Sequence, residues 1–277
     1  MKLYQYLITI CLGVLLLPVN SWADRFDSKQ DLLLAQFDTN RDPDDIHAIA
    51  ALGCLLAHDD YADVKYLAVH GAYGIQKDEN FIPSPQLFEM VFGKEDETWV
   101  NASPQDPEWN GAVAKIAAKV KPVLNAGGKV WVAEAGQSDI TADWVKALLA
   151  DGVSAELIKA NVIVVQHSDW NENHTAPDHL SYVKKMCTYQ VINDGNGNAT
   201  KRDPAAPATP SYRSVNKDFQ QEALNSPNQK TKSFWIEAKR VIDEEGYFPK
   251  HSSISTGGVD FSDVVESHWI LGSSSDY

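Results

Sequence analysis

Short apolar runs of strand length alternate with amphipathic helical patterns along this chain, and this alternation limits what the chain can fold into. Leu32–Phe37 is an apolar run followed by acidic residues, and in the next segment, residues 46–55, apolar residues recur at helical spacing. The same pairing of strand and helix returns further along the chain. Strands that are joined by helices in this way form parallel βαβ units. The sequence therefore predicts an α/β fold with an open, mostly parallel sheet flanked by helices.

The remaining predicted elements continue to the C-terminal part of the chain. Strands are predicted at residues 64–69, 129–133, 162–165 and 188–192, and helices at residues 112–124, 142–150, 177–186, 234–245 and 261–271. Residues 193–210 are rich in Asn, Gly, Ala and Pro, which predicts a long surface loop within one domain. We expect a sheet of five or more strands.

The first residues predict an exported protein. Lys2 precedes an apolar run at residues 7–18 that is too short to span a bilayer as a mature helix, and a small-residue cleavage site ends at Ala23. We expect a signal peptide at residues 1–23, one mature domain at residues 24–277 and a periplasmic or secreted location. The formal charge is −14, or −15 once the signal is removed, which disfavours nucleic acid as a partner. No membrane partner is expected after cleavage.

Two cysteines remain in the predicted mature chain, Cys54 and Cys187, so at most one disulfide can form. Cys54 lies on the apolar face of a predicted helix, which favours a buried free thiol. A disulfide between the two is the alternative interpretation, and neither residue has a sequence context typical of catalysis.

The most informative segment lies between the first predicted strand and its helix. Asp38, Asn40, Asp42, Asp44 and Asp45 place four carboxylates and one amide oxygen in a single loop. Oxygen ligands of this kind bind hard cations, and the number of ligands favours Ca²⁺, with Mg²⁺ as the alternative ion. Zinc is not expected, because the loop contains no His or Cys. The competing interpretation is helix capping by Asp42, with Asp44 and Asp45 at the positive end of the helix dipole.

This strand-to-helix loop resembles the signature of the inosine-uridine-preferring nucleoside hydrolase superfamily, D-x-D-P-x-x-D-D. Asp38, Asp44 and Asp45 fall on its first, seventh and eighth positions, whereas Asn40 stands where the family has the aspartate that binds metal and activates water. A related, uncharacterised branch of exported nucleoside-hydrolase-like proteins carries D-x-x-x-D-P-D-D, and residues 38–45 match that version completely. The chain resembles this branch more closely, which implies a Rossmann-like fold.

The resemblance implies a metal site built from separate parts of the chain. Asp38, Asn40 and Asp45 would bind the cation together with Asp263, which begins an apolar C-terminal pattern. A plain helix cap at Asp263 and ligation by Asp260 in its place are the alternatives.

The resemblance also implies residues that bind a sugar. Asp44 would hold a sugar hydroxyl, and the polar segment at residues 166–174 is dense in side chains that can bind hydroxyl groups or stack on a ring. The further substrate-binding candidates are Asp169, Trp170, Asn171, Asn173 and, at the end of another predicted strand, His70. A solvated loop is the alternative interpretation of the polar segment.

The activity that the resemblance implies is metal-dependent hydrolysis of an N-glycosidic bond in a nucleoside or a related ribosyl or glycosyl compound. The cation would bind vicinal sugar hydroxyls and a water, and Asp38 or Asp42 would deprotonate that water. His167 is a candidate for protonating the leaving group, with His70 and His174 as alternatives. The expected partner is a small sugar or nucleoside ligand, and the resemblance allows a homo-oligomer.

Two other functions are compatible with the sequence. A non-catalytic, metal-dependent carbohydrate or nucleoside binder would keep the fold and the metal without the base, as Asn40 allows. An aspartate-based phosphatase also begins from an acid at a strand end, but its D-x-D pair is interrupted here by Asn40.

Overall fold

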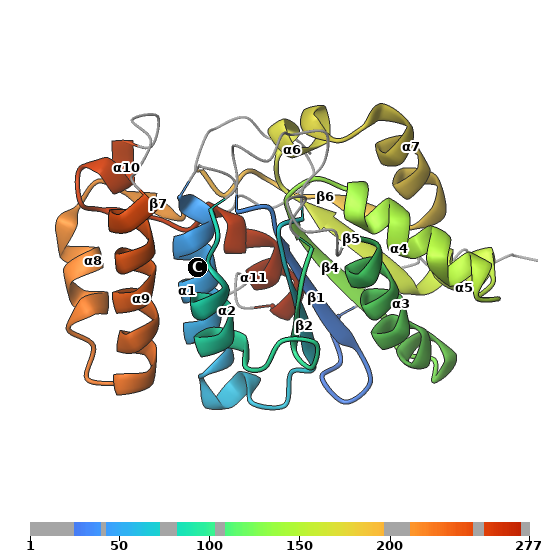
Figure 1. Cartoon of the computed structure of the whole chain (residues 1–277), viewed down its shortest axis with the longest axis horizontal. Helices are drawn as coiled ribbons and strands as arrows, with labels where there is room; N and C mark the ends of the chain where they lie inside the picture. Colours follow the sequence, from blue (N-terminus) through green and yellow to red (C-terminus); the bar gives the residue numbers. More distant parts are fainter. Residues whose placement is uncertain are drawn as a thin grey trace, which may run out of the picture.

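Six parallel strands form one open sheet at the centre of the computed structural model, in the order β3-β2-β1-β4-β5-β6 (Figure 1). The strands are β1 (Leu32–Phe37), β2 (Tyr66–His70), β3 (Trp99–Asn101), β4 (Val130–Ala135), β5 (Val162–Gln166) and β6 (Thr188–Val191). This confirms the predicted α/β fold. The strand order reverses between the neighbours β1 and β4, and open α/β sheets bind ligands at such a switch point, beyond the carboxyl ends of the strands.

The structure describes residues 25–39, 43–72, 82–102, 109–196, 211–245 and 252–272. The predicted signal peptide at residues 1–23, two predicted site residues, Asn40 and Asp42, and most of the predicted loop at residues 193–210 lie outside these ranges. Among the described residues, no helix has the length and apolar character needed to cross a membrane.

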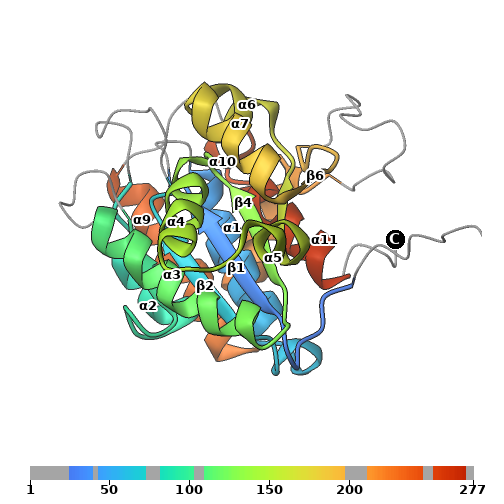
Figure 2. The ribbon, with the colours of Figure 1, turned by 90° about the vertical axis from the view of Figure 1, so that its right-hand side faces the viewer.

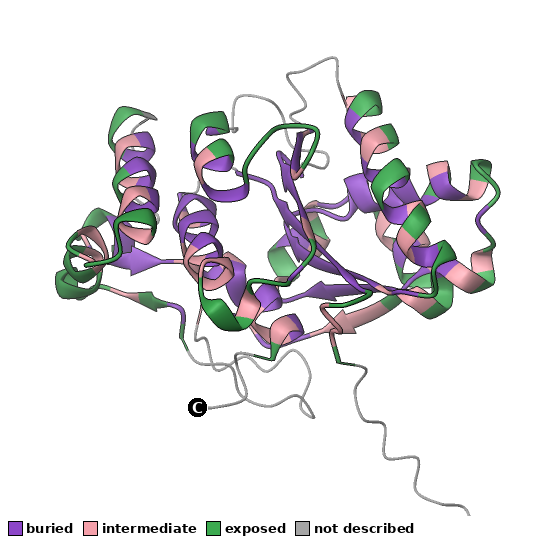
Figure 3. Ribbon diagram, turned by 90° about the horizontal axis from the view of Figure 1, so that it is seen from below, coloured by how far each residue is buried: buried purple, intermediate pink, exposed green. Residues whose placement is uncertain are grey.

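Helices cover both faces of the sheet, because successive side chains of each strand point to opposite faces. Leu33 and Phe37 of β1 face one core, and Leu34 faces the other. Lining the first core are α1 (Asp44–Leu56), α2 (Pro85–Phe92), α9 (Gln229–Glu245) and α11 (Val265–Leu271). Lining the second are α3 (Trp109–Asn125), α4 (Asp139–Ala150), α5 (Ala155–Asn161) and α7 (Pro177–Met186) (Figure 2). Strands β1 to β5 and the inner helix faces are mostly buried, whereas the edge strand β6 is only partly buried and the outer helix faces are exposed (Figure 3).

The C-terminal part of the chain adds an outer layer and then returns to the sheet. The outer elements, which pack on the side of α1 away from the sheet, are α8 (Lys217–Leu224), α9, α10 (Ser252–Ser255) and the antiparallel strands β7 (Arg213–Ser214) and β8 (Val259–Asp260) (Figure 1). A 3-10 turn at Ser262–Val264 follows β8 and contacts α1, and α11 then packs against β4 and β5. This return brings Asp263 back to the centre of the molecule.

Most predicted elements are confirmed to within a few residues, and two are corrected. The helix predicted at residues 261–271 is a 3-10 turn at Ser262–Val264 followed by the shorter α11. The polar segment predicted as a loop contains a helix, α6 (Asp169–His174), because the Ser168 side chain accepts a hydrogen bond from the Asn171 N–H and caps its first turn.

Cys54 and Cys187 are both free thiols, as the favoured interpretation predicted. Cys187 is fully buried, whereas Cys54 is half-buried. The two pack in different cores, on opposite faces of the sheet, which explains why no bridge joins them.

Candidate metal centre

The chain leaves β1 through a strained turn at the switch point of the sheet. Thr39 has a φ of +47°, a left-handed conformation that a β-branched residue rarely adopts. Its N–H donates to Oδ2 of Asp45 at 2.7 Å, and its carbonyl accepts from the Ile82 N–H at 2.8 Å. Strain of this kind persists only where the surroundings impose it, and it is concentrated at functional sites. Here the buried Asp45 carboxylate holds the turn.

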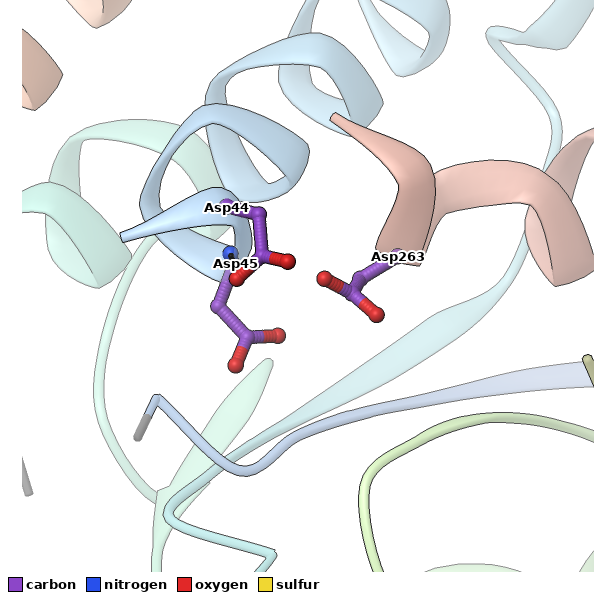
Figure 4. Close-up of side chains that lie close together, drawn as sticks. All are labelled: Asp44, Asp45 and Asp263. Atoms are coloured by element: carbon purple, nitrogen blue, oxygen red, sulfur yellow. Dashed lines mark hydrogen bonds between the residues drawn. The ribbon is translucent and has the colours of Figure 1, made fainter. Parts of the chain in front are cut away.

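Three carboxylates converge beside this turn. Asp44 and Asp45 begin α1, and Asp263 faces them from the 3-10 turn that precedes α11 (Figure 4). One oxygen atom from each residue lies within 4.8 Å of the others. Asp45 is buried, and Asp44 and Asp263 are half-buried. The positive end of the α1 dipole offsets part of the repulsion, and a divalent cation would offset the rest.

A second pair of side chains, the carboxylate of Asp38 and the amide of Gln137, meets across the switch point. Asp38, which directly follows β1, is buried, and its Oδ2 accepts a hydrogen bond from Nε2 of Gln137 at 2.8 Å. Gln137 follows β4, the strand at which the order reverses. The structure therefore places Asp38 where ligands of open α/β sheets bind.

Gly136 permits this close approach of the two strand ends. A Cβ atom at Gly136 would lie 2.9 Å from the Ala72 carbonyl oxygen and 3.0 Å from Cβ of Asp38. The first contact is closer than Cβ atoms show in proteins and the second is at that limit, so a larger residue would require the neighbouring chain to shift. The Gly136 carbonyl accepts a hydrogen bond from Nε2 of Gln166 at 3.0 Å, which connects the end of β5 to the end of β4.

His167 joins the carboxylates from the end of β5. Its Nε2 lies 3.7 Å from Oδ1 of Asp263, and its Nδ1 lies 2.5 Å from Oε1 of Glu266, a buried residue of α11. Burial opposes protonation of the ring, but the charge and hydrogen bond of Glu266, followed by the charges of Asp263 and Asp194, outweigh it and raise the pKa of His167 to about 9. Without a cation, the ring is charged at neutral pH.

The donor set fits a divalent cation. Besides the three carboxylates, two buried acceptor atoms have no hydrogen-bond partner among the described residues: Oε1 of Gln137, whose amide binds Asp38, and Oε2 of Glu266, whose other oxygen binds His167. A buried acceptor without a donor costs about 1–3 kcal/mol. A ligand that carries hydrogen-bond donors would satisfy these two atoms. Asp44, Asp45 and Asp263 are the residues that could hold the ion.

The predicted sugar-binding residues of the polar segment lie on α6, next to His167 in sequence. Asn171 is buried, and its Nδ2 donates to Oε1 of Gln166 at 3.3 Å, so it supports the turn that follows β5. The ring of Trp170 is 42% exposed and stacks on His174 with centroids 3.8 Å apart. Asp169 and Asn173 are exposed. These last residues lie outside the buried cluster.

His70 lies in an aromatic cluster, apart from the carboxylates. Its ring packs on Phe88 with centroids 4.5 Å apart, and Nε2 lies 3.1 Å from Oγ of Ser84. Burial lowers the pKa of His70 to about 3, so the ring is neutral at physiological pH. This surrounding favours a structural role for His70 over protonation of a leaving group.

Two alternative roles were considered for the acidic residues, capping of a helix and ligation of the cation by Asp260. Pro43 precedes α1 and provides no side-chain cap, while the cap predicted at Asp42 lies outside the described residues. Asp260 is buried, and its Oδ1 accepts from the N–H and Oγ of Ser262 at 3.3 and 3.0 Å. Asp260 therefore stabilises the 3-10 turn that carries Asp263.

Sequence reasoning missed Gln137 and Glu266. Glu266 follows Asp263 by three residues, and this spacing puts two side chains on one side of a helical turn, so the sequence contained a usable signal. Gln137 follows a predicted strand, where ligands of open sheets bind, but its contact with Asp38 depends on the order of the strands.

Comparisons of the chain with protein-family models, with curated proteins and with solved structures return no match. The geometry of the site and the motif at residues 38–45 are therefore the guides to its function.

Proposed function

We propose that this chain is a metal-dependent hydrolase of N-glycosidic bonds that acts on a nucleoside or a related ribosyl or glycosyl compound. The observation that carries the proposal is the convergence of the Asp44, Asp45 and Asp263 carboxylates at the switch point of the sheet. The D-x-x-x-D-P-D-D motif at residues 38–45, which resembles that of nucleoside-hydrolase-like proteins, supports the choice of reaction.

In this proposal Asp45 and Asp263 hold a divalent cation, and Asp44, the more exposed of the two acids at the start of α1, holds a sugar hydroxyl. When bound, the cation supplies positive charge that orients vicinal hydroxyls and acidifies a water. Carboxylate oxygens suit Ca²⁺, with Mg²⁺ as the alternative.

The buried residues around the cation then orient the reacting groups. Asp38 is the described carboxylate that can accept a proton, and the hydrogen bond from Gln137 at 2.8 Å fixes its orientation. His167 presents an imidazole whose orientation is fixed by Glu266. Burial of these groups excludes bulk water and strengthens their electrostatic effect on a bound ligand.

The second candidate function is a non-catalytic, metal-dependent carbohydrate or nucleoside binder. The observation that favours it is Asn40, which replaces the water-activating aspartate of the family that the motif resembles. Such a protein would bind the same cation and the same ligands but release no sugar.

Calorimetry of the purified protein with Ca²⁺ and Mg²⁺, followed by incubation with ribonucleosides and a reducing-sugar assay, separates the two. Asp45→Ala should abolish cation binding, whereas the control Asp243→Ala, which removes an exposed carboxylate of α9 paired with Lys239, should preserve it. Cation-dependent sugar release supports the hydrolase. Ligand binding without release supports the binder, and the absence of any cation binding overturns both.

A further inference from the structure

The turn that follows β4 contacts Asp38 through both its backbone and a side chain. The Ala135 carbonyl accepts a hydrogen bond from the Asp38 N–H at 3.2 Å, and Nε2 of Gln137 donates to Oδ2 of Asp38 at 2.8 Å. Between these two residues, Gly136 lies so near that an added Cβ atom would be 3.0 Å from Cβ of Asp38. The position of this turn, residues 135–137, therefore determines how the Asp38 carboxylate is oriented.

Glu134 and Ser138, the residues on either side of the turn, are joined by a hydrogen bond that closes it. Oγ of Ser138 donates to Oε2 of Glu134 at 2.7 Å, and both side chains are fully buried. Ser138 precedes α4, where a serine side chain commonly accepts a hydrogen bond from the first turn of the helix. Ser138 forms no such cap. Its hydroxyl group instead holds the two ends of the turn together.

The other oxygen of Glu134 is also bound, which makes the closure sensitive to a proton. Oγ1 of Thr141 donates to Oε1 of Glu134 at 2.7 Å and accepts from Nε2 of Gln36 at 2.8 Å. Ionised Glu134 accepts from both hydroxyl groups, and hydrogen bonds to a charged acceptor are about twice as strong as neutral ones. Protonation turns one carboxyl oxygen into a donor, so one hydroxyl group can no longer donate to it. The turn is therefore held more tightly when Glu134 is ionised.

The surroundings of Glu134 allow this change of charge near neutral pH. Burial raises the pKa of Glu134 to about 7 against the two hydrogen bonds that it accepts, and the charges of Glu266 in α11 and Asp139 in α4 add to the increase. Cys187 and Tyr189, which also interact with Glu134, have pKa values that burial raises, so both are neutral. None of these four groups carries a positive charge that would keep Glu134 ionised.

We propose that Glu134 is a positioning residue for Asp38, which it holds through Ser138 and the turn at residues 135–137, and that loss of the Glu134 proton tightens the contact between Gln137 and Asp38. The side-chain hydrogen bonds of Glu134 run to Ser138 and Thr141, so its effect on Asp38 passes through the turn. The inference rests on the proposed function, in which Asp38 accepts a proton.

NMR titration of the cation-free protein tests this coupling without an assay of activity. The carboxyl carbon-13 signal of Glu134 and the side-chain nitrogen-15 signal of Gln137 should change together, with a midpoint near pH 7. Glu134→Gln should remove the change at Gln137. Ser138→Ala should also remove it, although Glu134 still titrates, at a higher pH because it has lost a hydrogen bond. The matched control is Ser154→Ala at the serine that caps α5, and it should leave both signals as in wild type.

The titration of the unmodified protein gives an answer even if the variants fail to fold. A Gln137 signal that stays constant while Glu134 titrates overturns the inference. A response that persists in Ser138→Ala overturns it as well, because the charge of Glu134 would then act through space and not through the turn.

Sugar release provides a separate measurement. If the protein hydrolyses nucleosides, Ser138→Ala should lower kcat roughly 10- to 100-fold with a smaller change in KM, because a misaligned base slows the chemical step. An unchanged kcat contradicts the positioning role. If no sugar is released, the proposed hydrolase is overturned, while the NMR titration still decides whether Glu134 controls the contact between Gln137 and Asp38.

Discussion

The Nδ1 atom of His167 lies 2.5 Å from Oε1 of Glu266, although 99 positions of sequence separate the two residues. His167 comes from the end of β5, and Glu266 comes from α11, the last helix described. The contact therefore links the C-terminal segment to the centre of the sheet. It also places Asp263, one turn before Glu266, opposite the acidic start of α1 (Figure 4).

Glu266→Gln should lower the pKa of His167 in the cation-free protein from about 9 toward or below its ordinary value near 6.5. Burial of the ring disfavours the charged form, and the variant removes the largest of the opposing contributions. Nitrogen-15 NMR titration of the imidazole measures this change. Glu156→Gln, at an exposed acid of α5, is the control. A pKa that remains near 9 in the variant would contradict this expectation. It would show that the charges of Asp263 and Asp194 are enough to keep the pKa of His167 raised.

The buried carboxyl group of Glu134 should make the protein less stable as pH rises. Burial raises the pKa of Glu134 to about 7, although hydrogen bonds from Ser138 and Thr141 oppose the shift. The unfolded chain loses this proton near pH 4.5, so the free energy of unfolding falls between about pH 4.5 and 7. A shift of this size corresponds to at most about 3 kcal/mol.

Glu134→Gln removes this charge and should flatten the pH dependence. The variant should match wild type near pH 4 and exceed it in stability above pH 7, as urea unfolding across the pH range would show. Glu156→Gln, an exposed substitution of the same kind, should follow the wild-type curve. Parallel curves for wild type and Glu134→Gln would contradict the raised pKa.

Gly136→Ala should reduce both stability and cation affinity. The added methyl group would press on the Ala72 carbonyl and on Asp38, and overpacking of this kind costs about 1–3 kcal/mol. The matched control is Gly111→Ala in α3, where an added Cβ meets nothing within 4 Å. It should be neutral or stabilise by up to about 1 kcal/mol. Urea unfolding and calorimetry measure both quantities, and equal behaviour of the two variants would rule out the close approach.

Cys54 should react with a thiol reagent before Cys187 does. Burial raises the pKa of both thiols, and that of Cys187 reaches about 12, which leaves almost no reactive thiolate. Cys54→Ser identifies the faster phase in an Ellman assay of the folded protein. Unfolding in urea should release Cys187 without a reductant, whereas a requirement for reductant would indicate a disulfide.

Local sequence patterns were sufficient to predict most of the elements that carry the site. The apolar run at Leu32–Phe37 and the helical spacing after Pro43 predicted β1 and α1, because strand and helix periodicity are read from neighbouring residues. The three-residue strand Trp99–Asn101 was not predicted, because so short a segment shows no period. The cap at Ser168 turned a polar segment into α6 although its composition is typical of a loop.

The sequence by itself determined the alternation of strands and helices, the parallel α/β class and the acidic loop that begins at Asp38, since all three depend on residues close together in the chain. Only the tertiary structure decided which of these segments meet. The strand order places Gln137 against Asp38, and the return of α11 places Asp263 and Glu266 against α1 and His167. These contacts join residues that are distant in sequence. They depend on how the helices pack on the two faces of the sheet, and a pattern of neighbouring residues cannot predict that packing.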